Sequence, residues 1–126
     1  MGVVGLHHVQ LACPAGSEDA LRGFYGELVG LPEIAKPPAL AVRGGVWFRA
    51  GTHELHCGVE DGFVPARKAH PAFAVDDVDS LAEAVTRAGG EVHWDANIPG
   101  VRRFHTFDPV GNRVEFQLAR AEENTP

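Results

Sequence analysis

An internal repeat is the feature that most restricts how this chain can fold. The segments HVQLAC (8–13) and HPAFAV (70–75) each begin with histidine and continue with apolar residues at alternate positions. This alternation is typical of a strand that buries one of its two faces. Because each segment is followed by a short turn and then by a helical apolar pattern, the repeat predicts two similar modules.

The two modules have the same predicted order of elements. Ser17 is expected to cap the first helix and Asp77 the second, and apolar stripes with helical spacing follow both residues. Strand-like segments come after each helix and are bounded by glycine and proline. They lie at 32–36, 46–50 and 54–59 in the first module and at 91–95, 101–107 and 113–118 in the second. Each module therefore has the order βαβββ.

The predicted fold class is α+β, with the two modules forming a cupped mixed β-sheet and the helices on its outer face. The chain is expected to be a single domain made of module one (about 5–60), a linker (60–68), module two (about 69–118) and a polar tail (119–126). On each strand one parity is apolar and would pack under a helix. The opposite parity is mostly polar and would line the concave face.

Composition and charge exclude several classes of protein. The 126 residues carry a net charge of −6 and contain no basic run, which argues against binding to nucleic acid or to an anionic membrane surface. No apolar stretch approaches the roughly 20 residues that cross a bilayer, and no signal-peptide pattern begins the chain. Cys13 and Cys57 lack the spacing of a disulfide framework or a metal knuckle. We therefore expect a soluble, cytoplasmic protein.

Four chemically capable residues occupy repeat-equivalent positions. His8 and His70 head the first strand of each module, and His56 and Glu115 lie within the last strand of each. If the four strands line one concavity, three imidazoles and a carboxylate would form a divalent-metal site. His7 has the opposite parity and is expected at the strand edge. The alternative is a polar cavity in which the histidines pair with carboxylates and hold no metal.

The expected register of the last hairpin adds further candidates. A five-residue loop at 108–112 would place His105 across from Glu115 and Arg103 across from Gln117. His105 is then a candidate for proton transfer, and Arg103 for binding a substrate carboxylate or phosphate. A polar wall and simple surface exposure are the respective alternatives.

The first module offers an aromatic candidate by the same reasoning. A two-residue turn at 51–52 would place Trp47 across from His56. Trp47 could then form an aromatic wall or lid of the pocket, although a tryptophan at such a position more often serves packing alone.

The chain resembles the vicinal oxygen chelate superfamily, which includes glyoxalase I, extradiol dioxygenases, fosfomycin-modifying thiol transferases and metal-free bleomycin-resistance proteins. The resemblance covers about 5–118 and rests on HHVQLAC, FYGELVGLP, ELHCGV, AHPAFAVDDVDSL and RRFHTFDPVGNRVEFQL, of which DPVGNRVEF is the most specific part. It implies a glyoxalase-like fold and a homodimer with shared sites. It also implies a divalent metal ion, whether Zn, Ni, Mn or Fe, with His8, His70 and Glu115 as ligands and His56 at a fourth position.

The same resemblance implies a metal-dependent enzyme that chelates two oxygens of a small metabolite and stabilises an enolate or alkoxide, as a lyase or isomerase. Glu115 and His105 are the expected catalytic residues; the expected substrate contacts are Trp47, Arg103, Gln10 and Gln117. His56 stands where glyoxalase I has glutamate, which counts against lactoylglutathione chemistry. Two alternatives stay open: an iron dioxygenase or thiol transferase of the same fold, and a non-catalytic binding or antibiotic-resistance protein of the bleomycin type.

Overall fold

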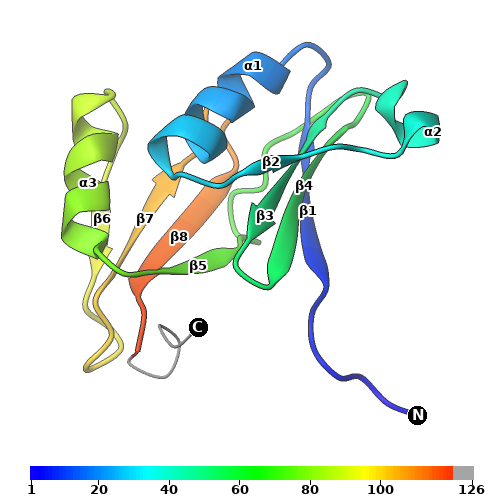
Figure 1. Cartoon of the computed structure of the whole chain (residues 1–126). Helices are drawn as coiled ribbons and strands as arrows, with labels where there is room; N and C mark the ends of the chain where they lie inside the picture. Colours follow the sequence, from blue (N-terminus) through cyan, green and yellow to red (C-terminus); the bar gives the residue numbers. More distant parts are fainter. Residues whose placement is uncertain (121–126) are drawn as a thin grey trace. The chain divides into compact units, whose positions relative to one another are not determined.

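The computed structural model describes residues 1–120 and divides the chain into two compact units, Met1–Pro65 and Ala66–Pro126 (Figure 1). Each unit contains one four-stranded mixed sheet with a helical segment between its first two strands. The predicted α+β class with two βαβββ modules is therefore confirmed. The boundary between the units falls within the linker predicted at 60–68. The predicted tail (119–126) lies, from residue 121 on, outside the described residues.

The sheet of the first unit has the strand order β1-β4-β3-β2. β1 (His8–Cys13) runs parallel to β4 (His53–Val59), and β3 (Val46–Ala50) is antiparallel both to β4 and to the short β2 (Glu33–Ile34). The sequence did not predict α2 (Pro38–Ala41). This single turn begins with proline in the first helical position, where the missing N–H costs nothing, and is too short to show a helical period.

The long helical segment of the first unit departs from the predicted α-helix. It begins as α1 (Glu18–Leu21) and continues as the π-helix η1 (Arg22–Leu28). The expected cap is wrong, because the Ser17 hydroxyl donates to the carbonyl oxygen of Pro14 at 2.7 Å rather than accepting from the helix. The buried ring of Tyr25 packs near Phe48 of β3, which confirms the apolar stripe on this segment.

The second unit repeats the topology with the strand order β5-β8-β7-β6. The strands are β5 (Ala72–Val75), β6 (His93–Asp95), β7 (Arg103–Phe107) and β8 (Arg113–Leu118), and α3 (Val78–Arg87) follows β5. The predicted cap of α3 is confirmed, since the carboxylate of Asp77 accepts the N–H of Ser80 at 3.0 Å. A cap of this kind contributes about 1 kcal/mol to helix stability.

The core of each unit lies between its helix and the apolar face of its sheet. In the second unit Phe104 and Phe116 are fully buried, with ring centroids 5.4 Å apart. Val78 and Val85 bury the facing side of α3. Each such side chain stabilises the fold by roughly 1.5–3 kcal/mol. The opposite parity of the same strands is thereby left to carry polar side chains, as the alternation predicted.

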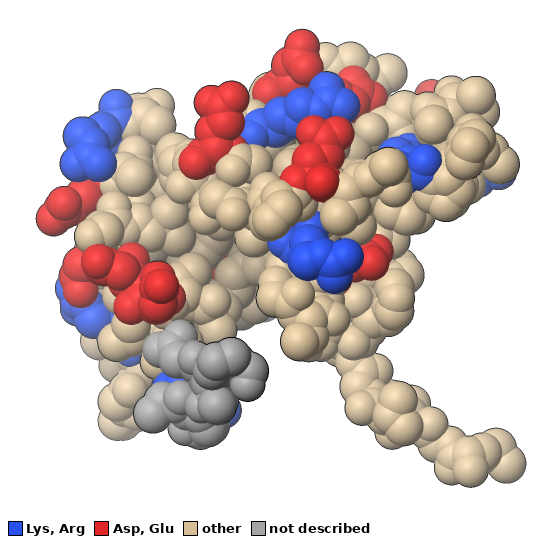
Figure 2. All heavy atoms as spheres, viewed as in Figure 1, with Lys and Arg blue, Asp and Glu red and all other residues tan. Residues whose placement is uncertain are grey.

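Charged side chains of both signs are interleaved on the face shown in Figure 2. Arg22 illustrates this, because its guanidinium contacts both Asp19 (3.0 Å) and Glu33 (2.9 Å). Among the described residues there is no helix long and apolar enough to cross a membrane.

Candidate metal centre

The turn between β7 and β8 is closed by its own side chains and backbone. Oδ1 of Asp108 accepts hydrogen bonds from the N–H groups of Val110 (3.1 Å) and Asn112 (2.9 Å). The Asp108 N–H donates in turn to the carbonyl oxygen of Asn112 at 2.8 Å. Gly111 has a φ of +94°, which glycine adopts without steric strain. The DPVGN sequence therefore fixes a five-residue loop and, with it, the register of the two strands.

That register confirms the predicted pairing of polar residues across the hairpin. His105 lies opposite Glu115, and Arg103 lies opposite Gln117. All four side chains therefore project from the same face of the sheet, on neighbouring strands. This places an imidazole, a guanidinium and an amide around one carboxylate.

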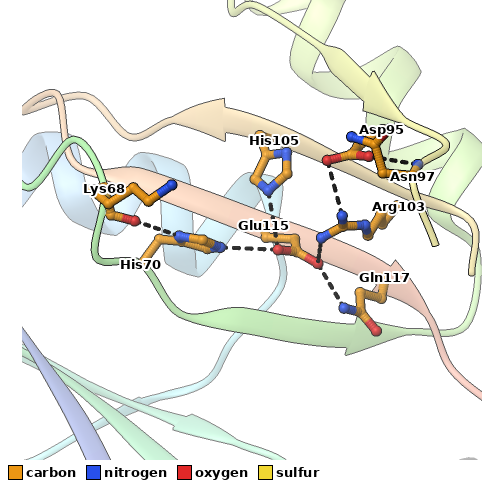
Figure 3. Close-up of polar contacts among 8 residues, drawn as sticks. All are labelled: Lys68, His70, Asp95, Asn97, Arg103, His105, Glu115 and Gln117. Atoms are coloured by element: carbon orange, nitrogen blue, oxygen red, sulfur yellow. Dashed lines mark hydrogen bonds and ion pairs between the residues drawn. The ribbon is translucent and has the colours of Figure 1, made fainter.

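Three candidate metal ligands converge on this face of the second unit (Figure 3). His70 precedes β5, His105 is in β7 and Glu115 is in β8, and their ligand atoms all lie within 4.8 Å of one another. Oε1 of Glu115 is 3.0 Å from Nε2 of His70 and 3.1 Å from Nε2 of His105. The Glu115 side chain is 3% exposed and that of His70 is 24% exposed, so solvent reaches the cluster mainly at His70.

The orientation of His70 is set by a backbone contact. Its Nδ1 lies 2.8 Å from the carbonyl oxygen of Lys68. Because a carbonyl can only accept, Nδ1 carries a proton and Nε2 is directed at Glu115. Histidines that bind metals usually have their second nitrogen fixed in this way.

Glu115 is surrounded by hydrogen-bond donors on both oxygens. Oε1 faces the two imidazoles, while Oε2 accepts from Nη1 of Arg103 (3.2 Å) and Nε2 of Gln117 (2.6 Å). Burial alone would raise the pKa of this carboxyl group. The hydrogen bonds from Gln117, His70 and Arg103 outweigh burial and lower the pKa of Glu115 to about 2. The group is therefore a carboxylate at any physiological pH.

His105 is the most deeply enclosed imidazole of the cluster. Burial lowers its pKa below the usual 6.5, and the positive charge of Arg113 acts in the same direction. The opposing influence of the Glu115 carboxylate is smaller. At neutral pH this imidazole is therefore uncharged, the form in which histidine binds a metal ion.

The repeat-equivalent positions of the first unit bring rings together rather than ligand atoms. The Trp47 and His56 rings are stacked with centroids 3.7 Å apart and planes inclined by 3°. The His8 ring stacks on the other side of His56 at 4.2 Å. The predicted register of Trp47 with His56 is confirmed. Nε2 of His56 lies 2.8 Å from Oε1 of Glu54, so this nitrogen already has a hydrogen-bond partner within the first unit.

The remaining predicted residues of the first unit lie beside this stack. Gln10 pairs with His56 in the β1–β4 register, and its side chain covers Gly58, where a Cβ would come within 2.9 Å of the amide nitrogen. His7 precedes β1 and is exposed, as expected, but its Nδ1 lies 3.0 Å from Nδ1 of His8.

The predicted metal set is thus distributed over the two units, with His8 and His56 in the first and His70 and Glu115 in the second. The second unit brings His70 and Glu115 together and adds His105, which the sequence had suggested for proton transfer. Among residues 1–120, no other group of three His, Cys, Asp or Glu side chains brings its ligand atoms this close together. Sequence reasoning had the signal for His105, since its register with Glu115 was predicted. It had none for the Lys68 carbonyl.

Replacing His56 with alanine is expected to destabilise the protein by about 2 kcal/mol, because the change leaves a gap between two packed rings. Phenylalanine at the same position keeps the stack and should cost less than about 1 kcal/mol. Urea denaturation of both variants measures the difference. Equal losses would show that the Glu54 contact, not the stack, is what His56 contributes to stability.

No family model and no curated protein matches the chain. Among solved structures, a Bacillus anthracis protein described as a glyoxalase family member is 46% identical, over 95% of this chain and 98% of that one, with a TM-score of 0.90. Lactoylglutathione lyase from Agrobacterium tumefaciens is 22% identical over 94% and 96% of the two chains (TM-score 0.72). The fosfomycin resistance protein FosX from Listeria monocytogenes is 18% identical over 98% and 100% (TM-score 0.73). These last two show the fold alone.

Taken with the fold and the histidine–carboxylate cluster, these similarities define a protein of the vicinal oxygen chelate superfamily. The extent and identity of the first match show that the chain belongs to the glyoxalase family.

Proposed function

We propose that the protein is a metal-dependent enzyme whose metal centre includes His70, His105 and Glu115. The observation that carries the proposal is the approach of two imidazole nitrogens to one oxygen of a buried carboxylate. Two imidazoles and a carboxylate suit zinc, nickel, manganese or iron. When bound, such an ion would act as a Lewis acid on two neighbouring oxygens of a small metabolite.

The roles of the side chains follow from their contacts. His70 is held by the Lys68 carbonyl with Nε2 toward the cluster, and His105 is kept uncharged by burial. Glu115 provides the negative charge. The hydrogen bonds that lower its pKa make Glu115 a weak proton acceptor, so a catalytic base at Glu115 requires that some of them be released first. Lyase or isomerase chemistry by proton transfer is the first candidate activity.

A second candidate is an iron-dependent dioxygenase. Two histidines and one carboxylate with positions left open are the ligand set of non-heme iron oxygenases. The identity of the metal helps to separate the two candidates, because zinc has no redox chemistry and does not activate oxygen, whereas iron does. We expect a small-molecule substrate and a homodimer in either case.

Elemental analysis of protein purified without an affinity tag tests the proposal. We expect a stoichiometric amount of one divalent metal per chain, removed by a chelator and restored by the same ion. Redox-active iron would favour the dioxygenase. A chain that takes up none of the four metals when each is supplied would overturn the proposal and favour a non-catalytic binding protein.

A further inference from the structure

We propose that Arg103 and Gln117 are positioning residues that restrict Glu115 to a single donor oxygen, Oε1, when it binds a metal ion. The inference rests on the metal centre proposed above. The two oxygens of the Glu115 carboxylate face different groups: Oε1 faces the two imidazoles, and Oε2 faces Arg103 and Gln117 (Figure 3). Neither residue acts as a ligand in this arrangement, because both direct N–H groups toward the carboxylate.

The position of Arg103 is fixed independently of Glu115. Its Nη2 donates to Oδ2 of Asp95 at 2.9 Å, and the side chain is only 14% exposed. Oδ1 of Asp95 accepts the N–H of Asn97 at 2.8 Å. That backbone hydrogen bond, followed by the charge of Arg103, lowers the pKa of Asp95 and keeps it ionised. Arg103 is therefore held between two carboxylates on neighbouring strands, and it cannot follow Glu115 if that side chain rotates.

Gln117 approaches the same oxygen from the other direction along β8. Its Nε2 lies 2.6 Å from Oε2 of Glu115, on the strand that also carries the carboxylate. Turning Oε2 toward the imidazoles would break this hydrogen bond and the charge-assisted one from Arg103. It would also leave a largely buried guanidinium with one carboxylate in place of two. The hydrogen bonds from Arg103 and from Gln117 therefore both oppose binding of a metal ion through two oxygens of Glu115.

The consequence for the centre is an additional coordination position. A carboxylate that binds through one oxygen occupies one position instead of two, so more of the metal's coordination remains for oxygens of the substrate. Arg103 also balances the charge of Glu115, which leaves the centre favourable to a substrate that develops negative charge. This role differs from the direct substrate contact that the sequence suggested for Arg103.

Infrared difference spectra of zinc-loaded minus zinc-free protein test this inference. The antisymmetric and symmetric stretching bands of a carboxylate are widely separated when one oxygen binds the metal and close together when both do. We expect the wide separation in the unaltered protein and a narrow one in Arg103→Met, which keeps the stem and removes the donors. Glu115→Gln assigns the bands, since they must disappear in that variant.

The neighbouring arginine provides the matched control. Arg102 is exposed and donates to Asp79 of α3, with Nε 3.1 Å from Oδ1, and is not among the donors of Glu115. Arg102→Met should leave the spectrum unchanged. Gln117→Met offers a second way to release Oε2 if Arg103→Met does not fold, and should narrow the separation in part.

The outcomes separate this inference from the proposed function. Zinc uptake is measured first, by elemental analysis, and its absence from the unaltered protein would overturn the metal centre itself. Zinc uptake with a narrow separation in the unaltered protein would overturn single-oxygen binding and leave the centre standing. A wide separation that persists in Arg103→Met and Gln117→Met would show that these two residues do not impose it.

Discussion

The His105→Ala protein is expected to bind zinc more than about 100-fold more weakly than the unaltered protein. His105 supplies one of the three ligand atoms that lie within 4.8 Å of one another. Loss of residues that merely orient a ligand already costs 10- to 100-fold in metal affinity, so loss of a ligand should cost at least as much. Competition with a chromophoric zinc chelator measures the change, and circular dichroism checks that the variant is folded.

His93 provides the control for this experiment. It pairs with His105 between β6 and β7 and so shares the same face of the sheet, but its side chain is 57% exposed and lies near Glu91 instead of the cluster. His93→Ala should bind zinc as the unaltered protein does. Equal weakening in the two variants would place the bound ion away from the cluster, and unchanged affinity in His105→Ala would remove His105 from the ligand set.

The parts of the fold that follow from alternation and turn chemistry could be predicted from the sequence. Asp77 begins α3 as expected, and the turn from Asp108 to Asn112 sets the predicted register of β7 and β8. These features depend on residues close together in the chain. The π-helical hydrogen bonding of η1, where the N–H of Val29 donates to the carbonyl of Phe24 five residues earlier, is rare in proteins and has no comparable local signal in the sequence.

The residues of the candidate site could be predicted from the sequence, but the role of each one could not. The repeat singles out His70 and Glu115, and strand register adds His105. Whether an imidazole becomes a ligand or a proton carrier depends on how its nitrogens lie relative to the neighbouring donors and acceptors, which periodicity does not determine. The Asp95–Arg103 pair was missed because Asp95 lies in a strand of three residues whose register with β7 has no turn signal to define it.

The two units show how one set of strand positions can be used in two ways. Trp47 and His56 stand to each other on β3 and β4 as His105 and Glu115 stand on β7 and β8. In the first unit two flat rings at these positions favour stacking. In the second unit the carboxylate of Glu115 stands where the first unit has the His56 ring, and this carboxylate accepts hydrogen bonds from the neighbouring side chains. The difference between the units therefore follows from the side chains at these two paired positions.

The stability of the metal-free protein should fall with acidification more steeply than that of the Glu115→Gln variant. The pKa of Glu115 is about 2 in the folded protein and near 4.5 when the group is unperturbed. Because the folded-state pKa is lower, ionisation favours folding, and this contribution is fully present above about pH 4.5 and is lost as the pH falls toward 2. The lowered pKa corresponds to about 3 kcal/mol.

Urea denaturation in the presence of a chelator, at pH 6, 4 and 3, measures this contribution. Glu115→Gln should be less stable than the unaltered protein by about 3 kcal/mol at pH 6, and the gap should narrow as the solution is acidified. Other carboxylates with lowered pKa values, such as Asp77 and Asp95, are present in both proteins and cancel in the difference. Glu83→Gln, on the exposed side of α3, should show no comparable gap. A gap that stays constant with pH would mean that the groups around Glu115 stabilise its side chain through packing and shape and not through its charge.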